Sequence, residues 1–261
     1  MRKVLEKKQK KLLIECSSEK KNFRLEEKLG VDKRSCLLIK PGILDYKKAL
    51  NLQESILKAK KEGKIEEEVL IFLQHPPTIT IGKKGSLNEI LMDTSKLKQK
   101  GISIYNTGRG GRVTYHGPGQ IVGYPIFDLR KHKKDLHLYL RNLEEVIIKS
   151  LSDFGVKAGR KKGLTGVWVN EKKIASIGVQ VKNWISMHGF ALNVNCDLSY
   201  FKLIQPCGMQ AEVMTSLNNI LQNNVEIERV EESLVKNFKK IFHLTAIKID
   251  TSFYKNYLPG A

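Results

Sequence analysis

Cysteine is scarce in this chain. The four cysteines, Cys16, Cys36, Cys196 and Cys207, are widely separated and form no CxxC pair. Zinc ribbons and disulfide frameworks need closely spaced or numerous cysteines, so we expect neither, and we expect no resident metal. Isolated thiols are typical of a reducing compartment, which favours the cytoplasm.

Long hydrophobic runs are also missing. No apolar stretch approaches the ~20 residues of a membrane-spanning helix, and the longest candidates are short strands such as residues 69–73. The first dozen residues are basic, without the apolar segment and small-residue cleavage site of a secretory signal. We therefore expect neither export nor a membrane partner.

Acidic residues and arginines are few compared with lysine. The formal net charge is +19, and the 46 basic residues comprise 37 lysines and 9 arginines. Proteins that read phosphate groups favour arginine for its bidentate geometry, and no zinc-finger or RNA-binding motif accompanies the charge. A nucleic-acid partner is not expected, whereas electrostatic steering toward acidic proteins is compatible with this composition.

Two parts of the chain differ in character. Residues 1–35 are rich in lysine and glutamate and predict a basic N-terminal extension, whereas residues 36–261 alternate strands and helices without a linker and predict one catalytic domain. Because hairpins are interspersed with single helices, we expect an α+β fold with a mixed, largely antiparallel sheet flanked by helices. The expected strands are residues 35–39, 69–74, 78–81, 102–106, 121–127, 166–169, 173–181 and 190–194, and the expected helices are 45–63, 135–154 and 226–243.

A dense glycine cluster runs from Gly108 to Gln120, with the sequence GRGGRVTYHGPGQ. Glycines let the backbone approach a ligand closely, and here they are interleaved with two arginines, a tyrosine and a histidine. The spacing fits neither a phosphate-binding Walker loop nor a dinucleotide-binding fingerprint. A ligand site is favoured over a simple glycine-rich hairpin, which stays the alternative.

One cysteine stands in an unusual setting. Cys207 follows a proline and precedes a glycine, and a reactive thiol needs a cation or base to form its thiolate. Lys173 is one candidate, because strand alternation places it on one face with Ala175 and Ile177. His116 and His188 are rival bases.

Four segments together resemble the lipoyl(octanoyl) transferase family, which is related to the catalytic domain of biotin and lipoate protein ligases. They are HPPT from His75, RGGRVTYHGPGQIVGYP from Arg109, GVWVNEKKIASIG from Gly166, and the stretch from Trp184 to Gly208 with TSL at 215–217. The resemblance spans roughly residues 36–245. It implies the ligase-like catalytic fold and a cavity that binds an acyl chain.

The resemblance also implies residue roles. Cys207 would carry the acyl group as a thioester, and Lys173 would lower the pKa of that thiol and transfer protons. The acyl substrate would be lined by Arg109, Gly110, Gly111, Arg112, Val113, Thr114, Tyr115, His116, Ser176, Ile177, Gly178, Gly189, Phe190 and Ala191.

The implied reaction is the first step of endogenous protein lipoylation and needs no cofactor. The donor would be octanoyl-acyl carrier protein, and the acceptors would be lipoyl domains of 2-oxoacid dehydrogenase complexes or the glycine cleavage H protein. The alternatives are an ATP-dependent lipoate or octanoate ligase on the same fold, an amidotransferase between lipoyl-type proteins, and a basic binding protein without turnover.

Overall fold

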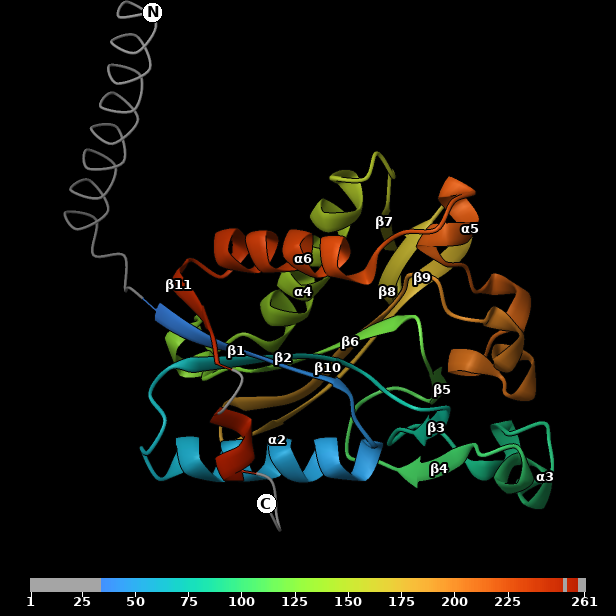
Figure 1. Ribbon diagram of the computed structural model, residues 1–261, viewed down its shortest axis with the longest axis horizontal. Helices are drawn as coiled ribbons and strands as arrows, with labels where there is room; N and C mark the ends of the chain where they lie inside the picture. Colours follow the sequence, from blue (N-terminus) through green and yellow to red (C-terminus); the bar gives the residue numbers. More distant parts are fainter. Residues whose placement is uncertain (1–33, 251–252, 258–261) are drawn as a thin grey trace, which may run out of the picture. The chain divides into compact units, whose positions relative to one another are not determined.

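A computed structural model of the protein describes residues 34–250 and 253–257 (Figure 1). These residues belong to one compact unit that begins at Arg34. The expected N-terminal extension lies outside the described residues, except for its last two positions, which begin the first strand. The boundary expected at residue 36 stays a prediction.

The main sheet has eight strands in the order β11-β1-β2-β6-β10-β9-β8-β7. Strand β1 pairs in parallel with both β2 and β11, and every other neighbouring pair is antiparallel. The predicted mixed, largely antiparallel sheet is therefore confirmed. The strand bounds are Arg34–Ile43 (β1), Glu68–Gln74 (β2), Gln120–Ile126 (β6), Gly159–Lys161 (β7), Leu164–Val169 (β8), Lys172–Lys182 (β9), Ile185–Asn193 (β10) and Leu244–Ile249 (β11).

A smaller sheet of three strands lies beside one end of the main sheet. Its central strand, β3 (Thr78–Ile81), pairs in parallel with β4 (Ser103–Asn106) and antiparallel with β5 (Val113–His116). Residues 113–116 belong to the glycine cluster, where we expected no separate strand. The four side chains of β5 are all buried, which a solvent-exposed loop would not allow.

Helices cover both faces of the main sheet (Figure 1). Helix α2 (Tyr46–Lys61) packs on one face, and α4 (Leu136–Ser152) and α6 (Ile227–Ile241) pack on the other. Asp45 caps α2, as predicted, because its carboxylate accepts the backbone N–H groups of Lys47 and Lys48 at 2.9 and 3.1 Å. Short helices α3 (Thr94–Gln99) and α5 (Leu217–Leu221) lie in the connections, as do 3-10 turns at Leu87–Glu89, Leu129–Lys131, Leu198–Leu203, Pro206–Gly208, Ala211–Val213 and Phe253–Tyr257.

The hairpin predicted around Asn170 is confirmed. Asn170 adopts a left-handed backbone conformation with φ of 53°, which asparagine tolerates better than most residues, and β8 and β9 pair on either side of it. Within the described ranges, no helix is long and apolar enough to cross a bilayer.

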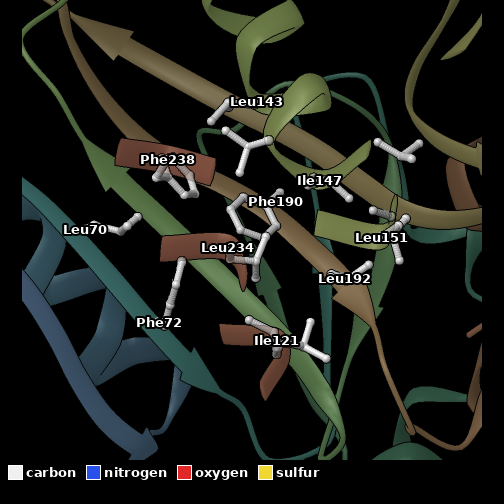
Figure 2. Packing of buried hydrophobic residues seen from close by; sticks show 14 of the residues in the cluster. Leu70, Phe72, Ile121, Leu143, Ile147, Leu151, Phe190, Leu192, Leu234 and Phe238 are labelled. Carbon is white, nitrogen blue, oxygen red and sulfur yellow. The ribbon is translucent and has the colours of Figure 1, made fainter. Parts of the chain in front are cut away.

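Aromatic rings form the centre of the core between the sheet and α6. Phe238 of α6 is fully buried, and its ring lies 6.0 Å from Phe72 and 6.1 Å from Phe190, measured between ring centroids. Figure 2 shows these rings meeting across the layers, with Leu234 and Leu143 beside them. Phe238 therefore packs α6 against strands β2 and β10 of the main sheet.

We predict that Phe238→Ala lowers the free energy of unfolding by about 3–5 kcal/mol, because it removes a buried ring and leaves a cavity. Urea unfolding followed by circular dichroism measures this loss. The exposed Lys240 on the same helix gives the control, and Lys240→Ala should change stability by less than about 0.5 kcal/mol. Equal effects of both substitutions would contradict this account of the core.

Candidate active site

A cavity of about 470 Å³ opens beside strands β6, β9 and β10, next to the glycine cluster. Part of this space is open to solvent. Its walls combine the start of α2, the glycine cluster and strands of both sheets. The lining residues are Tyr46, Arg109, Gly111, Arg112, Thr114, His116, Val122, Tyr124, Ser176, Ile177, Gly178, His188, Gly189, Phe190 and Ala191.

The register between β9 and β10 brings two predicted segments together. Gly178 pairs with Gly189, Ile177 with Phe190 and Ser176 with Ala191. A Cβ atom at Gly178 would lie 2.7 Å from the Gly110 carbonyl oxygen. Glycine is therefore needed there because the loop backbone packs directly on the strand.

Backbone hydrogen bonds fix the glycine cluster over the cavity. The Gly110 N–H donates to the Val179 carbonyl at 2.9 Å, and the Lys83 N–H donates to the Arg109 carbonyl at 3.0 Å. The Arg109 guanidinium is buried and donates to the Thr80 hydroxyl and carbonyl oxygens at 2.8 and 2.7 Å. The cluster is thus an ordered wall of the site.

Two of the three buried histidines near the cavity are fully hydrogen-bonded. The Thr80 hydroxyl accepts from Arg109, so its own hydrogen points to His116 Nε2 at 3.2 Å. His116 Nδ1 then donates to the Gln120 side-chain oxygen at 2.8 Å, because the Gln120 amide nitrogen is itself a donor to other carbonyls. Burial, together with nearby His75 and Arg109, holds the pKa of His116 well below its usual value.

His75 is fixed in the same way. Its Nδ1 donates to the Leu44 carbonyl at 2.7 Å, and its Nε2 accepts from the Tyr124 hydroxyl at 2.8 Å. Burial lowers the pKa of His75 to about 4. His75 and His116 are therefore neutral near pH 7, and neither has a ring nitrogen left for a reacting group.

His188 differs from both. It is 2 % exposed and lines the cavity, and neither of its ring nitrogens has a hydrogen-bond partner among the described residues. Burial, with further contributions from Arg109 and Lys182, lowers the pKa of His188 to about 3. A neutral imidazole there offers one donor and one acceptor.

Lys173 is buried at the start of β9, with 3 % of its surface exposed. Its Nζ lies 5.5 Å from the centroid of the Trp168 ring. A Cβ atom at Gly166 would lie 2.7 Å from Lys173 Cε and 3.3 Å from Nζ, so the absence of a side chain at Gly166 makes room for the lysine. This amine is therefore shielded from water.

The segment that contains Cys207 runs past both Lys173 and Arg112. Pro206–Gly208 form a 3-10 turn whose backbone is described, whereas the Cys207 side chain lies outside the described parts. A Cβ atom at Gly208 would lie 3.1 Å from Nε of Arg112, which lines the cavity. Farther along, the Thr215 N–H donates to the Lys173 carbonyl at 3.0 Å. The backbone thus places position 207 close to one end of the cavity wall.

The other described thiols are poor nucleophiles. Cys36 and Cys196 are free and buried. Burial raises the pKa of Cys196 to about 12 and that of Cys36 further still. Both therefore stay protonated near pH 7. Among residues 34–250 and 253–257, no group of three or more His, Cys, Asp or Glu side chains could hold a metal ion.

The structure brings most of the predicted substrate-binding residues to the cavity. Gly110, Val113 and Tyr115 are not in its lining, and the last two pack into a separate hydrophobic cluster with Phe201 and Met214. Four further residues line the cavity that the sequence did not indicate as substrate-binding: Tyr46, Val122, Tyr124 and His188, the last of which was expected only as a rival base. The roles themselves stay predictions.

Comparison with known proteins agrees with the resemblance seen in the sequence. The model of the lipoyl protein ligase A/B catalytic domain matches residues 45–239. An octanoyltransferase of Solibacter usitatus is 47 % identical over 209 residues, which are 80 % of this chain and 94 % of that protein. An octanoyltransferase of Thermoanaerobacter sp. strain X514 is 46 % identical over 216 residues, which are 82 % and 93 % of the two chains.

Solved structures share the fold at lower identity. The crystal structure of lipoate-protein ligase A bound with ATP superposes with a TM-score of 0.71 at 20 % identity, covering 87 % of this chain and 93 % of that one. The putative lipoate protein ligase Ta0514 of T. acidophilum with bound lipoic acid gives a TM-score of 0.68 at 20 % identity, covering 87 % and 93 %. The fold is therefore that of the ligase catalytic domain, and this chain belongs to the lipoyl protein ligase A/B catalytic domain family, among its octanoyltransferases.

Proposed function

We propose that this protein transfers an octanoyl group from octanoyl-acyl carrier protein to a lysine of a lipoyl domain, through a thioester on Cys207. The observation that carries the proposal is the cavity beside the glycine cluster, whose wall strand β9 also holds the buried amine of Lys173. The identity of 46–47 % with octanoyltransferases along nearly their whole length supports the same reaction.

Cys207 is the proposed nucleophile. A thiolate attacks a thioester carbonyl far better than a thiol does, and an ordinary cysteine with a pKa of ~8.5 is mostly thiol at neutral pH. The two other described thiols are buried with raised pKa values, which leaves position 207 as the better candidate among these three cysteines. Its turn lies next to Arg112 in the cavity wall.

Lys173 is the proposed partner of that thiol. Its ammonium is shielded from water against the Trp168 ring, and a cation in such surroundings favours a nearby thiolate over a thiol. We propose that Lys173, rather than His116, carries the proton in both steps. His116 has a depressed pKa and both ring nitrogens engaged, so it is a weak and obstructed base.

The proposed reaction proceeds by two acyl transfers. The Cys207 thiolate attacks the donor thioester, the carbon–sulfur bond to the carrier breaks, and the carrier thiolate leaves with a proton from Lys173. The acceptor lysine, as a neutral amine, then attacks the enzyme thioester and forms an amide. Its proton passes to Lys173 while the Cys207 thiolate is regenerated, so the sum is thioester plus amine giving amide plus thiol.

The positive charge beside the cavity suits acidic donor and acceptor proteins. Exposed Lys83 and Lys84 follow β3, and their backbone N–H groups bond to the carbonyls of Arg109 and Gly111 beside the cavity. Arg112, half-exposed, lies in the same wall. We propose that these cations steer acidic carrier proteins and lipoyl domains, those of 2-oxoacid dehydrogenase complexes or the glycine cleavage H protein, and that the protein works in the cytoplasm.

Replacing the nucleophile tests the mechanism. Cys207→Ala should reduce octanoyl transfer to a lipoyl domain by at least ~1,000-fold, because no thioester can form. The assay uses octanoyl-acyl carrier protein without ATP and measures the acylated acceptor by mass spectrometry, with Cys196→Ala as the matched control. Full activity of the Cys207→Ala enzyme, or a requirement for ATP with free octanoate, would refute the proposal.

Replacing the cation tests its effect on the thiol. Lys173→Met keeps much of the volume and removes the charge, so the pKa of the Cys207 thiol should rise by about 1–2 units toward its ordinary value. The pH dependence of iodoacetamide labelling at Cys207, located by peptide mapping, measures this change. An identical labelling profile in both proteins would contradict the role of Lys173.

A backbone substitution provides a second route to the same test. Gly166→Ala should displace the lysine side chain and slow transfer by about 10-fold or more, because its Cβ would come within 2.7 Å of Lys173 Cε and 2.6 Å of the Ala175 carbonyl oxygen. Gly163→Ala is the control, since Gly163 also has a positive φ (77°) but a Cβ there meets nothing within 4 Å. Similar losses in both variants would mean that backbone strain, and not the lysine position, matters.

Charge reversal tests the docking surface. The double variant Lys83→Glu, Lys84→Glu should lower kcat/KM for octanoyl-acyl carrier protein by about 10-fold at low salt, and the difference should shrink near 0.5 M salt. Lys61→Glu is the control, because it lies at the far end of α2, about 20 Å from Tyr46. Equal effects at both places would show that only net charge matters.

A further inference from the structure

The cavity ends at a buried histidine that the proposed chemistry does not use. Strands β9 and β10 form the wall from Ser176, opposite Ala191, to Gly178, opposite Gly189, and His188 occupies the next position of β10. Its partner in the register is Val179, which lies beyond Gly178 and six residues along β9 from Lys173. His188 therefore lies at the end of the cavity distant from the reacting groups, which argues against its role as a base for Cys207.

The backbone at His188 is strained in a way that keeps its ring there. Its φ is 57°, in the left-handed region that a residue with a side chain occupies only at an energetic cost. Its N–H donates to the side-chain oxygen of Gln53 at 2.8 Å, and Gln53 is completely buried in α2. This bond between helix and strand stabilises a conformation that would otherwise be disfavoured.

The polar atoms at this end have no partner in the part of the chain that the structure describes. Both ring nitrogens of His188 and the side-chain nitrogen of Gln53 are buried and unpaired. Each such group destabilises the protein when it stays unsatisfied. Nearby Tyr124 packs its ring edge-on against His188 at 6.4 Å, and its hydroxyl is already bonded to His75.

A plain alkyl chain that filled the cavity up to His188 would leave these donors and acceptors buried without partners. A hydroxyl group can donate to the unprotonated ring nitrogen of His188 or accept from the N–H of the other. The buried histidine thus discriminates between an apolar and a hydroxylated chain end, in the way that a site built for a hydroxyl rejects an analogue lacking it.

We propose that His188, held in place by Gln53, forms a polar subsite that binds a hydroxyl group on the distal part of the acyl chain, so that the enzyme accepts medium-length hydroxyacyl donors. This inference rests on the proposed acyl transfer and adds a second substrate class to it. His188 is then a specificity-determining residue whose contact is with the chain end and not with the reacting carbonyl.

The test compares octanoyl and 8-hydroxyoctanoyl thioesters of acyl carrier protein as donors for the full-length enzyme. The quantity measured is the ratio of kcat/KM for 8-hydroxyoctanoyl to that for octanoyl, which does not depend on the fraction of protein that is folded. His188→Leu should lower this ratio by about 10-fold or more, since one buried hydrogen-bonding partner is lost. The 3-hydroxyoctanoyl thioester, with its hydroxyl near the reacting end, should show no such change.

His188→Asn is the matched control, because asparagine is close to leucine in size, keeps a donor and an acceptor, and tolerates a positive φ. It should keep the ratio within about 3-fold of the wild-type value. Should His188→Leu not fold, His188→Gly removes the ring without strain and carries the same expectation. A ratio unchanged by both apolar substitutions overturns the polar subsite, whereas failure of the wild-type enzyme to transfer octanoyl overturns the proposed function itself.

Discussion

The buried amine of Lys173 is the constraint on which the site depends. A charged group at 3 % exposure is costly unless its surroundings stabilise the charge. Here the face of the Trp168 ring lies near the amine, and the absence of a side chain at Gly166 leaves room for it. The same residue joins β9 to the segment after the Cys207 turn, through the hydrogen bond from Thr215 to its carbonyl. Lys173 therefore contributes both the backbone contact to this segment and the cation that we propose acts on the Cys207 thiol.

The other polar side chains in and near the cavity wall are mostly neutral or already hydrogen-bonded. The histidines His75, His116 and His188 are neutral because burial depresses their pKa values, and two of them serve to hold the wall together. The buried Arg109 is occupied by the oxygens of Thr80. We therefore place the reacting groups near Lys173 and the acyl chain against the neutral residues at the other end of the cavity.

Much of the fold could be predicted from the sequence, because hydrophobic periodicity and capping residues are local signals. The long helix with Asp45 at its cap, the hairpin turning at Asn170 and the strand Thr78–Ile81 all appear where the pattern indicated. Strand β5 was missed because its residues stand inside a glycine-rich segment that reads as a loop. Edge strands β7 and β11 are short or partly exposed and give weak patterns.

The site was predictable as a set of segments but not side chain by side chain. Residues 113–116 were expected to line the substrate together, yet in a strand successive side chains point to opposite faces. Thr114 and His116 accordingly line the cavity, whereas Val113 and Tyr115 face a hydrophobic cluster. The contribution of His188 depends on a left-handed backbone and a bond to Gln53 in a distant helix, and neither can be deduced from spacing.

The central claim is that one sulfur carries the acyl group between donor and acceptor. Incubation of the purified protein with octanoyl-acyl carrier protein, followed by intact-mass and peptide mass spectrometry, tests it most directly. The account predicts one added octanoyl group, mapped to Cys207, released by hydroxylamine and lost when a lipoyl domain is supplied. An adduct on another residue, or turnover of the acceptor without any enzyme-bound octanoyl group, would contradict it.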